Sequence, residues 1–203
     1  MRKITKQTEP RQLTKFRNAG GTWNTFSLDD GKREVKKQLL AEQHSLCAYC
    51  TTSISFCTMK IEHWCPRTYC RDRHLDYANL LAVCKGCYNT GKFLHCDTSK
   101  ADQLIELSPL NVNHINVLSY SKATGKLLST NAKHQVEIDR VLNLNIAPLR
   151  KIRKQLLATF KLGLRKKYKN RRANFQKELS VWRQKNGPFD SIVIQYLEKR
   201  LLQ

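Results

Sequence analysis

Two Cys-x-x-Cys pairs frame the stretch of the chain whose residue types are best suited to chemistry. The first pair is Cys47 and Cys50, and the second is Cys84 and Cys87. Thiolates in two such pairs are typical ligands of a tetrahedral zinc ion, and a structural zinc can hold together a fold with a small core. We therefore predict that these four cysteines bind a structural Zn²⁺.

An acidic residue and a histidine stand side by side between the two pairs, as Glu62 and His63. Hydrolysis of a phosphodiester needs a base that deprotonates water and a cation that stabilises the charge on the phosphate. Histidine has an unperturbed pKa of about 6.5, so its neutral form is available as a general base at cellular pH. Two neighbours on a strand point to opposite faces, although a strand end or a bulge can bring both to one metal site.

Four short motifs, CAYC, IEHWCP, ANLL and CKGC, follow one another in this order. Together they resemble an HNH endonuclease with a zinc-stapled ββα-metal core. The longer strings IEHWCPRT, LDYANLLAVCKGC and HCDTSK are similar to the HNH nucleases of bacterial anti-phage systems, namely the Septu PtuB type and its retron-associated relatives. The resemblance covers roughly residues 30–145 and implies an α+β fold.

The resemblance also implies roles for individual residues. Glu62 stands where the family has a ligand of the catalytic divalent cation, Mg²⁺ or Mn²⁺, and His63 where it has the general base. Asn79 matches the middle residue of the HNH motif, whose amide holds a backbone loop and orients the base. The alternative for Asn79 is a capping role at the end of a short helix.

The third position of the HNH motif departs from the family, because Tyr88 stands where a histidine is common. Asn89 has the right spacing to Lys92, and an amide oxygen can bind a hard cation, so we prefer Asn89 as catalytic and metal-binding residue. His95 is the next candidate, and Asp97 is a further competitor.

Four further cysteines lack the spacing of a zinc knuckle and are expected to be core thiols. These are Cys57, Cys65, Cys70 and Cys96.

Hydrophobic patterning predicts the elements that position these residues. We expect a helix over residues 31–44, strands over 51–56 and 60–64, and a helix over 76–83. A hairpin should turn at residues 123–125, and a short helix should follow over 136–144. The C-terminal residues have the spacing of amphipathic helices.

The net charge of +21 and a pI near 9.9 indicate a polyanionic partner, most simply nucleic acid. Residues 148–187 hold 14 Lys and Arg against one acidic residue, Glu178. The alternative is a solvated basic face, but so one-sided an excess favours a surface that follows the phosphate backbone without reading sequence. The predicted nucleic-acid-binding residues are Arg150, Lys151, Lys154, Arg165, Lys166, Lys167, Arg171 and Arg172.

Composition divides the chain into three parts: a basic N-terminal arm (1–30), a nuclease core with its supporting hairpin (31–147) and a basic helical region (148–203). The arm is either partly disordered or a docking segment that uses Phe16, Trp23 and Phe26 as aromatic anchors. No apolar run is long enough for a membrane span, and no signal peptide is evident, so we expect a cytoplasmic protein.

These observations predict a metal-dependent HNH endonuclease, with DNA favoured over RNA as its substrate. The resemblance implies an effector nuclease of an anti-phage complex. Its partners would be an ABC- or SMC-like ATPase and, in retrons, a reverse transcriptase with its nucleic acid. The alternative is a zinc-dependent nucleic-acid-binding or interaction subunit without catalysis, but such a protein has no need of Glu62 and His63 beside an asparagine.

Overall fold

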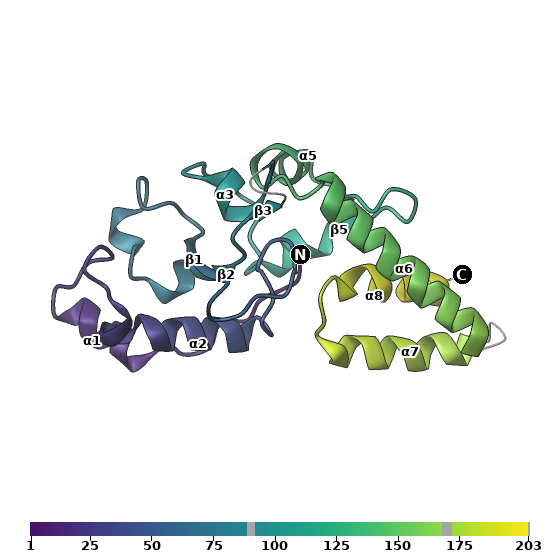
Figure 1. Ribbon diagram of the computed structural model, residues 1–203, viewed down its shortest axis with the longest axis horizontal. Coiled ribbons are helices and arrows are strands. Elements are labelled where there is room, and N and C mark those ends of the chain that lie inside the picture. Colours follow the sequence, from purple (N-terminus) through teal and green to yellow (C-terminus); the bar gives the residue numbers. More distant parts are fainter. Residues whose placement is uncertain (89–91, 168–171, 203) are drawn as a thin grey trace.

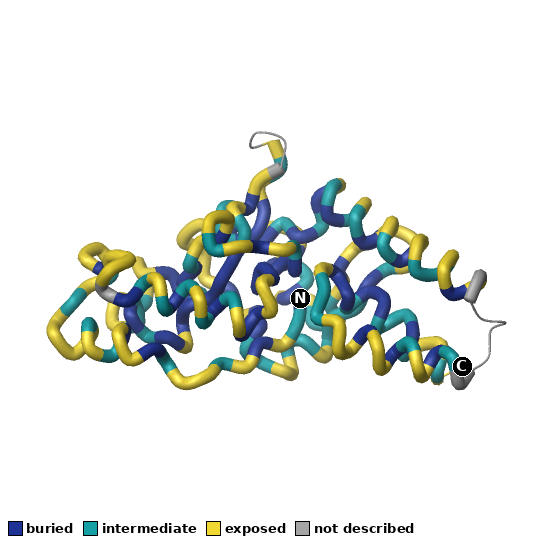
Figure 2. The backbone as a smooth tube through the Cα atoms, turned by 60° about the horizontal axis from the view of Figure 1, so that its bottom comes forward, coloured by how far each residue is buried: buried dark blue, intermediate teal, exposed yellow. Residues whose placement is uncertain are grey.

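A computed structural model describes residues 1–88, 92–167 and 172–202. The protein has a mixed α+β fold that is mostly helical. Two parts lie along its long axis (Figure 1). One part contains the N-terminal helices and the first strands of the chain, and the other contains the three C-terminal helices with the last strands beside them. Buried residues run through both parts and through the junction between them (Figure 2). None of the described helices is both long enough and apolar enough to cross a membrane.

The strand that carries Glu62 and His63 pairs with the strand that leads to Cys84. Strand β1 (Lys60–His63) is antiparallel to β2 (Leu80–Val83), and His63 lies opposite Leu80. All four residues of β2 are buried. The prediction of a helix over 76–83 is wrong, because a short continuous apolar run suits a buried strand as well as a helix. Only a 3₁₀ turn, Tyr77–Asn79, precedes the strand.

Residues 51–56 also differ from the prediction. In place of a strand they form a loop, whose one ladder contact is a bridge between Leu46 and Ser53. The paired strands of the core are therefore β1 and β2, which the loop 64–76 separates. The prediction of a helix over 31–44 is confirmed by α2 (Arg33–Glu42), which buries Val35 and Leu39.

A second small hairpin follows Cys84. Strand β3 (Cys87–Tyr88) pairs with β4 (Phe93–Leu94), and Cys87 lies opposite Leu94. Helix α3 (Cys96–Lys100) begins directly afterwards. The order of elements around the site is thus strand, loop, strand, hairpin and short helix.

Residues 1–30 pack against the core. Helix α1 (Arg11–Asn18) buries Leu13, while Met1, Ile4 and Phe26 are also buried. Phe16 and Trp23 are partly buried and pack on the same cluster. The aromatic residues of this segment therefore contribute to the fold, which leaves its polar surface as the part that could dock a partner.

The predicted hairpin around residues 123–125 is confirmed as β5 (Leu118–Tyr120) and β6 (Leu127–Ser129). Two short helices flank it, α4 (Val112–Asn116) and α5 (Ala132–Val136), and a π-helical turn, Glu137–Val141, continues α5. The short helix predicted over 136–144 thus begins and ends earlier.

The C-terminal helices are confirmed as α6 (Ala147–Lys167), α7 (Arg172–Lys185) and α8 (Asp190–Leu201). Phe160 of α6 meets Trp182 of α7 edge to face, with 5.2 Å between ring centroids. Arg153 is buried where α6 passes the hairpin, and it donates hydrogen bonds to the carbonyls of Leu144 and Gly125. The basic helices are thereby fixed to the rest of the chain.

Candidate active site and metal centre

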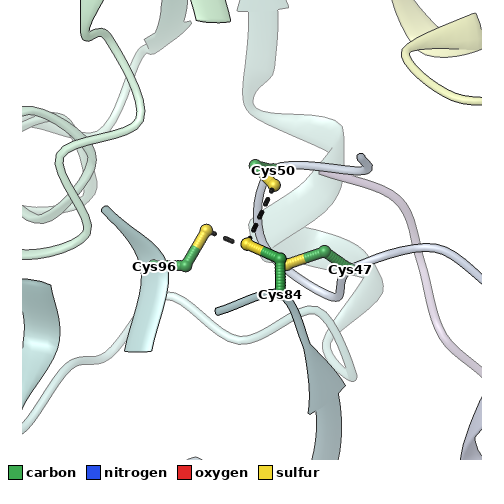
Figure 3. Close-up of side chains that lie close together, drawn as sticks. All are labelled: Cys47, Cys50, Cys84 and Cys96. Atoms are coloured by element: carbon green, nitrogen blue, oxygen red, sulfur yellow. Dashed lines mark hydrogen bonds between the residues drawn. The ribbon is translucent and has the colours of Figure 1, made fainter. Parts of the chain in front are cut away.

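Four cysteine sulfurs converge between the two small hairpins and the loop after α2. They belong to Cys47, Cys50, Cys84 and Cys96, and all lie within 4.8 Å of one another (Figure 3). The Sγ atoms of Cys47 and Cys96 are 3.8 Å apart, as are those of Cys50 and Cys84. Three of these cysteines are buried and Cys84 is half-buried.

The spacing fits a zinc ion. Tetrahedral coordination with Zn–S bonds of about 2.3 Å places neighbouring sulfurs about 3.8 Å apart. Burial raises the pKa of the Cys47 and Cys96 thiols, so that neutral thiols are favoured until a cation compensates the thiolate charge. Four converging sulfurs in a closed, largely buried position are typical of a structural zinc site.

The fourth sulfur comes from Cys96, and not from Cys87 as the spacing predicted. Strand β3 places Cys87 on an exposed edge opposite Leu94, and the β3–β4 hairpin then returns the chain to Cys84. Gly86 allows this return: its φ is +68°, and a Cβ there would lie 2.3 Å from the carbonyl oxygen of His95. Cys96, assigned to the core by its lack of a knuckle partner, therefore completes the cluster.

The other cysteines also differ from the expectation of core thiols. Cys65 and Cys70 form a disulfide within the loop between β1 and β2, and Cys57 is exposed.

Glu62 and His63 line one hollow, together with Trp23, Arg67 and Asp97. Both residues of the pair are buried. Strand alternation would separate them, but His63 is the last residue of β1, where the chain turns away into the loop. The strand end thus allows both side chains to reach the same space.

His63 is arranged to act as a neutral base. Its Nε2 lies 2.9 Å from the carbonyl oxygen of His74, and since a carbonyl only accepts, Nε2 carries the proton. The lone pair is therefore on Nδ1. The Trp23 ring packs against the imidazole, with 4.3 Å between centroids, and burial lowers the pKa of His63 to about 4. The ring is uncharged at neutral pH.

Glu62 shares its surroundings with another carboxylate and a buried lysine. The Nζ atom of Lys100 lies 2.7 Å from Oε1 of Glu62, and the Tyr49 hydroxyl donates to the same oxygen over 3.2 Å. Burial, followed by a hydrogen bond with Asp97, raises the pKa of Glu62 to about 8. Burial alone would raise the pKa of Asp97, but hydrogen bonds from Glu62 and Lys60 hold it below its usual value.

The interaction between the two carboxylates therefore moves their pKa values in opposite directions. A divalent cation would relieve the repulsion between the two groups when both are ionised, because carboxylate oxygens are preferred ligands of Mg²⁺ and Mn²⁺. Sequence reasoning named Asp97 only as a competitor and missed Lys100. Their shared position in the string HCDTSK, one turn apart on a helix, was the signal that could have found both.

Asn79 clamps the loop that follows His63. Its Oδ1 accepts from the backbone N–H of Cys65, while its Nδ2 donates to the carbonyls of Cys65 and Arg73. The side chain is fully buried. Asp76 provides the N-cap of the 3₁₀ turn, and Asn79 is the last residue of that turn. The hydrogen bonds of Asn79 are of the kind that the HNH resemblance implies for this position, and its role stays a prediction.

Of the two preferred candidates for the third motif position, the structure describes only His95. Asn89 lies outside the described residues. His95 is buried at the start of α3 and does not belong to the residues that line the space around His63. The structure places Asp97, from the first turn of α3, in that space instead.

The predicted basic residues form part of two surface hollows. Arg150, Lys151 and Lys154 line one between α6 and the β5–β6 turn. Arg165 lines the other, whose remaining charges are Lys122, Lys161 and Arg200 around the ring of Tyr196. Arg171 lies outside the described residues, as do the side chains of Lys166, Lys167 and Arg172.

The hollow around Tyr196 was missed because its cations come from separate segments. The Nζ atoms of Lys161 and Lys122 lie 4.9 and 5.3 Å from the centroid of the Tyr196 ring. Burial and repulsion from Lys161, Lys199 and Arg200 lower the pKa of Lys122. Since the described lining residues include no acid, this convergence of like charges is suited to a phosphate.

Comparison with known proteins also indicates a nuclease. No protein-family model matches the chain. It is 28% identical over 207 aligned positions to an Escherichia coli protein named "Retron Ec83 putative HNH endonuclease", and the alignment covers 79% of this chain and 80% of that protein. The similarity is distant but extends over most of both chains, and it supports nuclease activity.

The four-cysteine cluster predicts a sharp difference between two neighbouring cysteines. Cys96→Ser should remove one equivalent of zinc and destabilise the fold, because a structural zinc contributes roughly 10 kcal/mol or more. Cys87→Ser should keep the metal and the stability, since Cys87 is exposed. Elemental analysis and thermal unfolding of both variants measure this, and loss of zinc in Cys87→Ser alone would exclude the assignment of Cys96.

The low pKa of His63 predicts a dependence of stability on pH. The unfolded chain binds a proton at His63 below a pH of about 6.5, whereas the folded chain does so only near pH 4. Stability should therefore fall as the pH drops from 6.5 to 4, by no more than about 3 kcal/mol from this group. Urea unfolding of the wild type and of His63→Ala at pH 7 and pH 4.5 should show a smaller loss in the variant. An equal loss in both proteins would contradict the assigned pKa.

Proposed function

We propose that the chain is a zinc-stabilised HNH endonuclease that hydrolyses nucleic-acid phosphodiesters with one divalent cation, Mg²⁺ or Mn²⁺. DNA is favoured as the substrate by the HNH resemblance. The observation that carries the proposal is a buried histidine, held at Nε2 by the carbonyl of His74, that lines the same hollow as the carboxylates of Glu62 and Asp97. A protein that only binds nucleic acid has no need of this arrangement.

In the proposed reaction His63 accepts the proton of the attacking water at Nδ1. Its Nε2–H group keeps donating a hydrogen bond to the carbonyl oxygen of His74, which holds the ring and the tautomer in place. Asn79 is a positioning residue, because it fixes the loop that bears this carbonyl through its bonds to Cys65 and Arg73. Arg67 lines the hollow as a positive charge for the phosphate.

Glu62 and Asp97 are the residues that would hold the cation. When bound, the cation supplies stabilisation of the charge that develops on the phosphate and the leaving oxygen. Lys100 provides a fixed positive charge beside Glu62, so Glu62 can lose its proton without leaving an uncompensated buried charge. Asn89 remains a further candidate ligand.

Cleavage and binding should depend on different parts of the chain. The two basic hollows are lined by residues of the C-terminal helices and of the β5–β6 turn, whereas His63 is the last residue of β1. Strand β1 and helices α6 to α8 lie in different parts of the molecule (Figure 1). Contacts to the phosphate backbone give affinity without sequence preference. We propose that these hollows hold the nucleic acid while the HNH site cuts it.

A pair of variants tests the proposal. His63→Ala should abolish Mg²⁺-dependent nicking of plasmid DNA while leaving zinc content and DNA affinity unchanged, because His63 belongs neither to the cysteine cluster nor to the two basic hollows. Lys161→Ala with Arg200→Ala should weaken binding. It should also reduce the magnitude of the slope of log K against the logarithm of the salt concentration by about 2, since two phosphate contacts are lost. The measurements are a nicking assay and binding isotherms at several salt concentrations.

The matched control for the binding variant is Arg33→Ala with Lys37→Ala. It removes the same charge from exposed positions of α2, so it should change the salt dependence much less. A His63→Ala protein that nicks at the normal rate would show that His63 is not the general base, whereas a wild-type protein that binds DNA without nicking it would favour the alternative function, a binding module. Equal losses in the two double variants would show that only net charge matters.

We also propose that the nuclease works in a defence complex with an ATPase of the ABC or SMC-like class. In a retron the complex would also contain a reverse transcriptase and its nucleic acid. The anti-phage resemblance and the retron name of the similar protein support these partners. A chain with a net charge of +21 binds nucleic acid without sequence preference, so a free nuclease of this kind would need external control.

Docking through residues 1–30 must be tested on their surface, because a deletion would remove the buried Leu13 and Phe26. Arg11→Glu with Lys15→Glu changes two exposed positions of α1. We expect the wild type to co-elute with the ATPase encoded beside it in size exclusion, and this variant to elute alone with its nicking activity intact. Co-elution of the variant would move the docking surface elsewhere.

A further inference from the structure

A second group of metal-ligating side chains lies on the supporting module, away from the cysteine cluster. Glu106 belongs to the extended segment after α3, His114 to α4 and His134 to α5. One ligand atom from each lies within 4.8 Å of the others. None of the three lines the hollow around His63, so the proposed nuclease site makes no use of them.

His134 is the residue that calls for a ligand. Its side chain is only 2% exposed, and neither ring nitrogen has a hydrogen-bond partner among the described residues. A buried polar atom left without a partner costs about 1–3 kcal/mol, and such atoms are rare in native proteins.

The ring of His134 is already directed at the other two residues. Its Nε2 lies 3.4 Å from Oε1 of Glu106, and its centroid lies 4.6 Å from that of the His114 ring. Three potential metal ligands from three segments thus lie close together. His134, which is the more buried of the two histidines, has no competing hydrogen bond among the described residues.

The bonds that Glu106 and His114 make do not prevent ligation. Nδ1 of His114 accepts a hydrogen bond from the backbone N–H of Ser108 at 3.2 Å, which is long enough to be exchanged for a metal. Oε2 of Glu106 meets the exposed Lys133 over 2.7 Å, while Oε1 is the atom that faces His134.

We propose that Glu106, His114 and His134 bind a second divalent ion of the zinc type. Two imidazoles and one carboxylate form a ligand set that suits Zn²⁺ better than Mg²⁺, and three protein ligands leave a fourth position for water. The site is structural in the sense that it joins an extended segment to two short helices.

The joined segment passes close to the catalytic strand. Leu107, the neighbour of Glu106, accepts a hydrogen bond from Nε1 of Trp64, which directly follows His63. Glu137 accepts from the backbone N–H groups of both Glu106 and Leu107. A metal at Glu106 would therefore fix the segment against which the end of β1 rests.

Metal content of the full chain tests the proposal without any activity measurement. The wild type should hold two equivalents of zinc, and His134→Gln and His114→Gln should each hold one. In cobalt-substituted protein, the sulfur-to-cobalt absorption of the cysteine cluster should persist in the histidine variants and disappear in Cys96→Ser. Lys133→Ala, which removes the salt bridge but no ligand, should keep two equivalents.

Glu106→Gln guards against a folding artefact, because this carboxylate is half-exposed and its loss leaves the core unchanged. Zinc added back to wild-type protein from which a chelator has removed the second equivalent should raise Tm, and the rise should be absent in Glu106→Gln. A wild type with one zinc that Cys96→Ser removes, or a His134→Gln protein with two, would overturn the proposal. One zinc that His134→Gln removes would support it and refute the cysteine site instead.

Discussion

Convergence of the four cysteine sulfurs is the constraint on which the arrangement of the site depends. It joins the loop after α2, the end of β2 and the first residue of α3. Because Asp97 and Lys100 follow Cys96 on that helix, the cluster sets their distance from Glu62 on β1. A zinc ion would hold this distance without a large core, and its removal would release the helix from the strand pair.

Burial is the second influence on the site, and it acts differently on each group. It lowers the pKa of His63 to about 4, which favours the neutral imidazole. It raises the pKa of Glu62 to about 8, which opposes the ionised carboxylate. The buried Lys100 offsets part of the free-energy cost of burying the Glu62 carboxylate through its contact with that group. Opposite shifts in neighbouring groups are typical of sites that perform acid–base chemistry.

The basic charge of the C-terminal helices is physically separate from the hollow around His63. Their cations gather around Tyr196 and beside the β5–β6 turn, with Arg153 anchoring α6 to the rest of the chain. In the proposed function, affinity for a polyanion comes from one part of the molecule and hydrolysis from another.

The sequence by itself indicated a cysteine metal site and an HNH-like site, because the residue types that bind metal or accept protons can be read directly from it. The pair Glu62-His63, three of the four sulfurs and the position of Asn79 follow from short motifs whose spacing is local. The helices α2, α6, α7 and α8 and the β5–β6 hairpin follow from periodicity over many residues. Only the tertiary structure decided the fourth sulfur, the identity of β2 and the partners of Glu62. Cys96 replaces Cys87 because a hairpin returns the chain, and Leu80–Val83 forms a strand because β1 pairs with it. Lys100 and Asp97 contact Glu62 although they are far from it in the sequence, so no local pattern predicts these contacts.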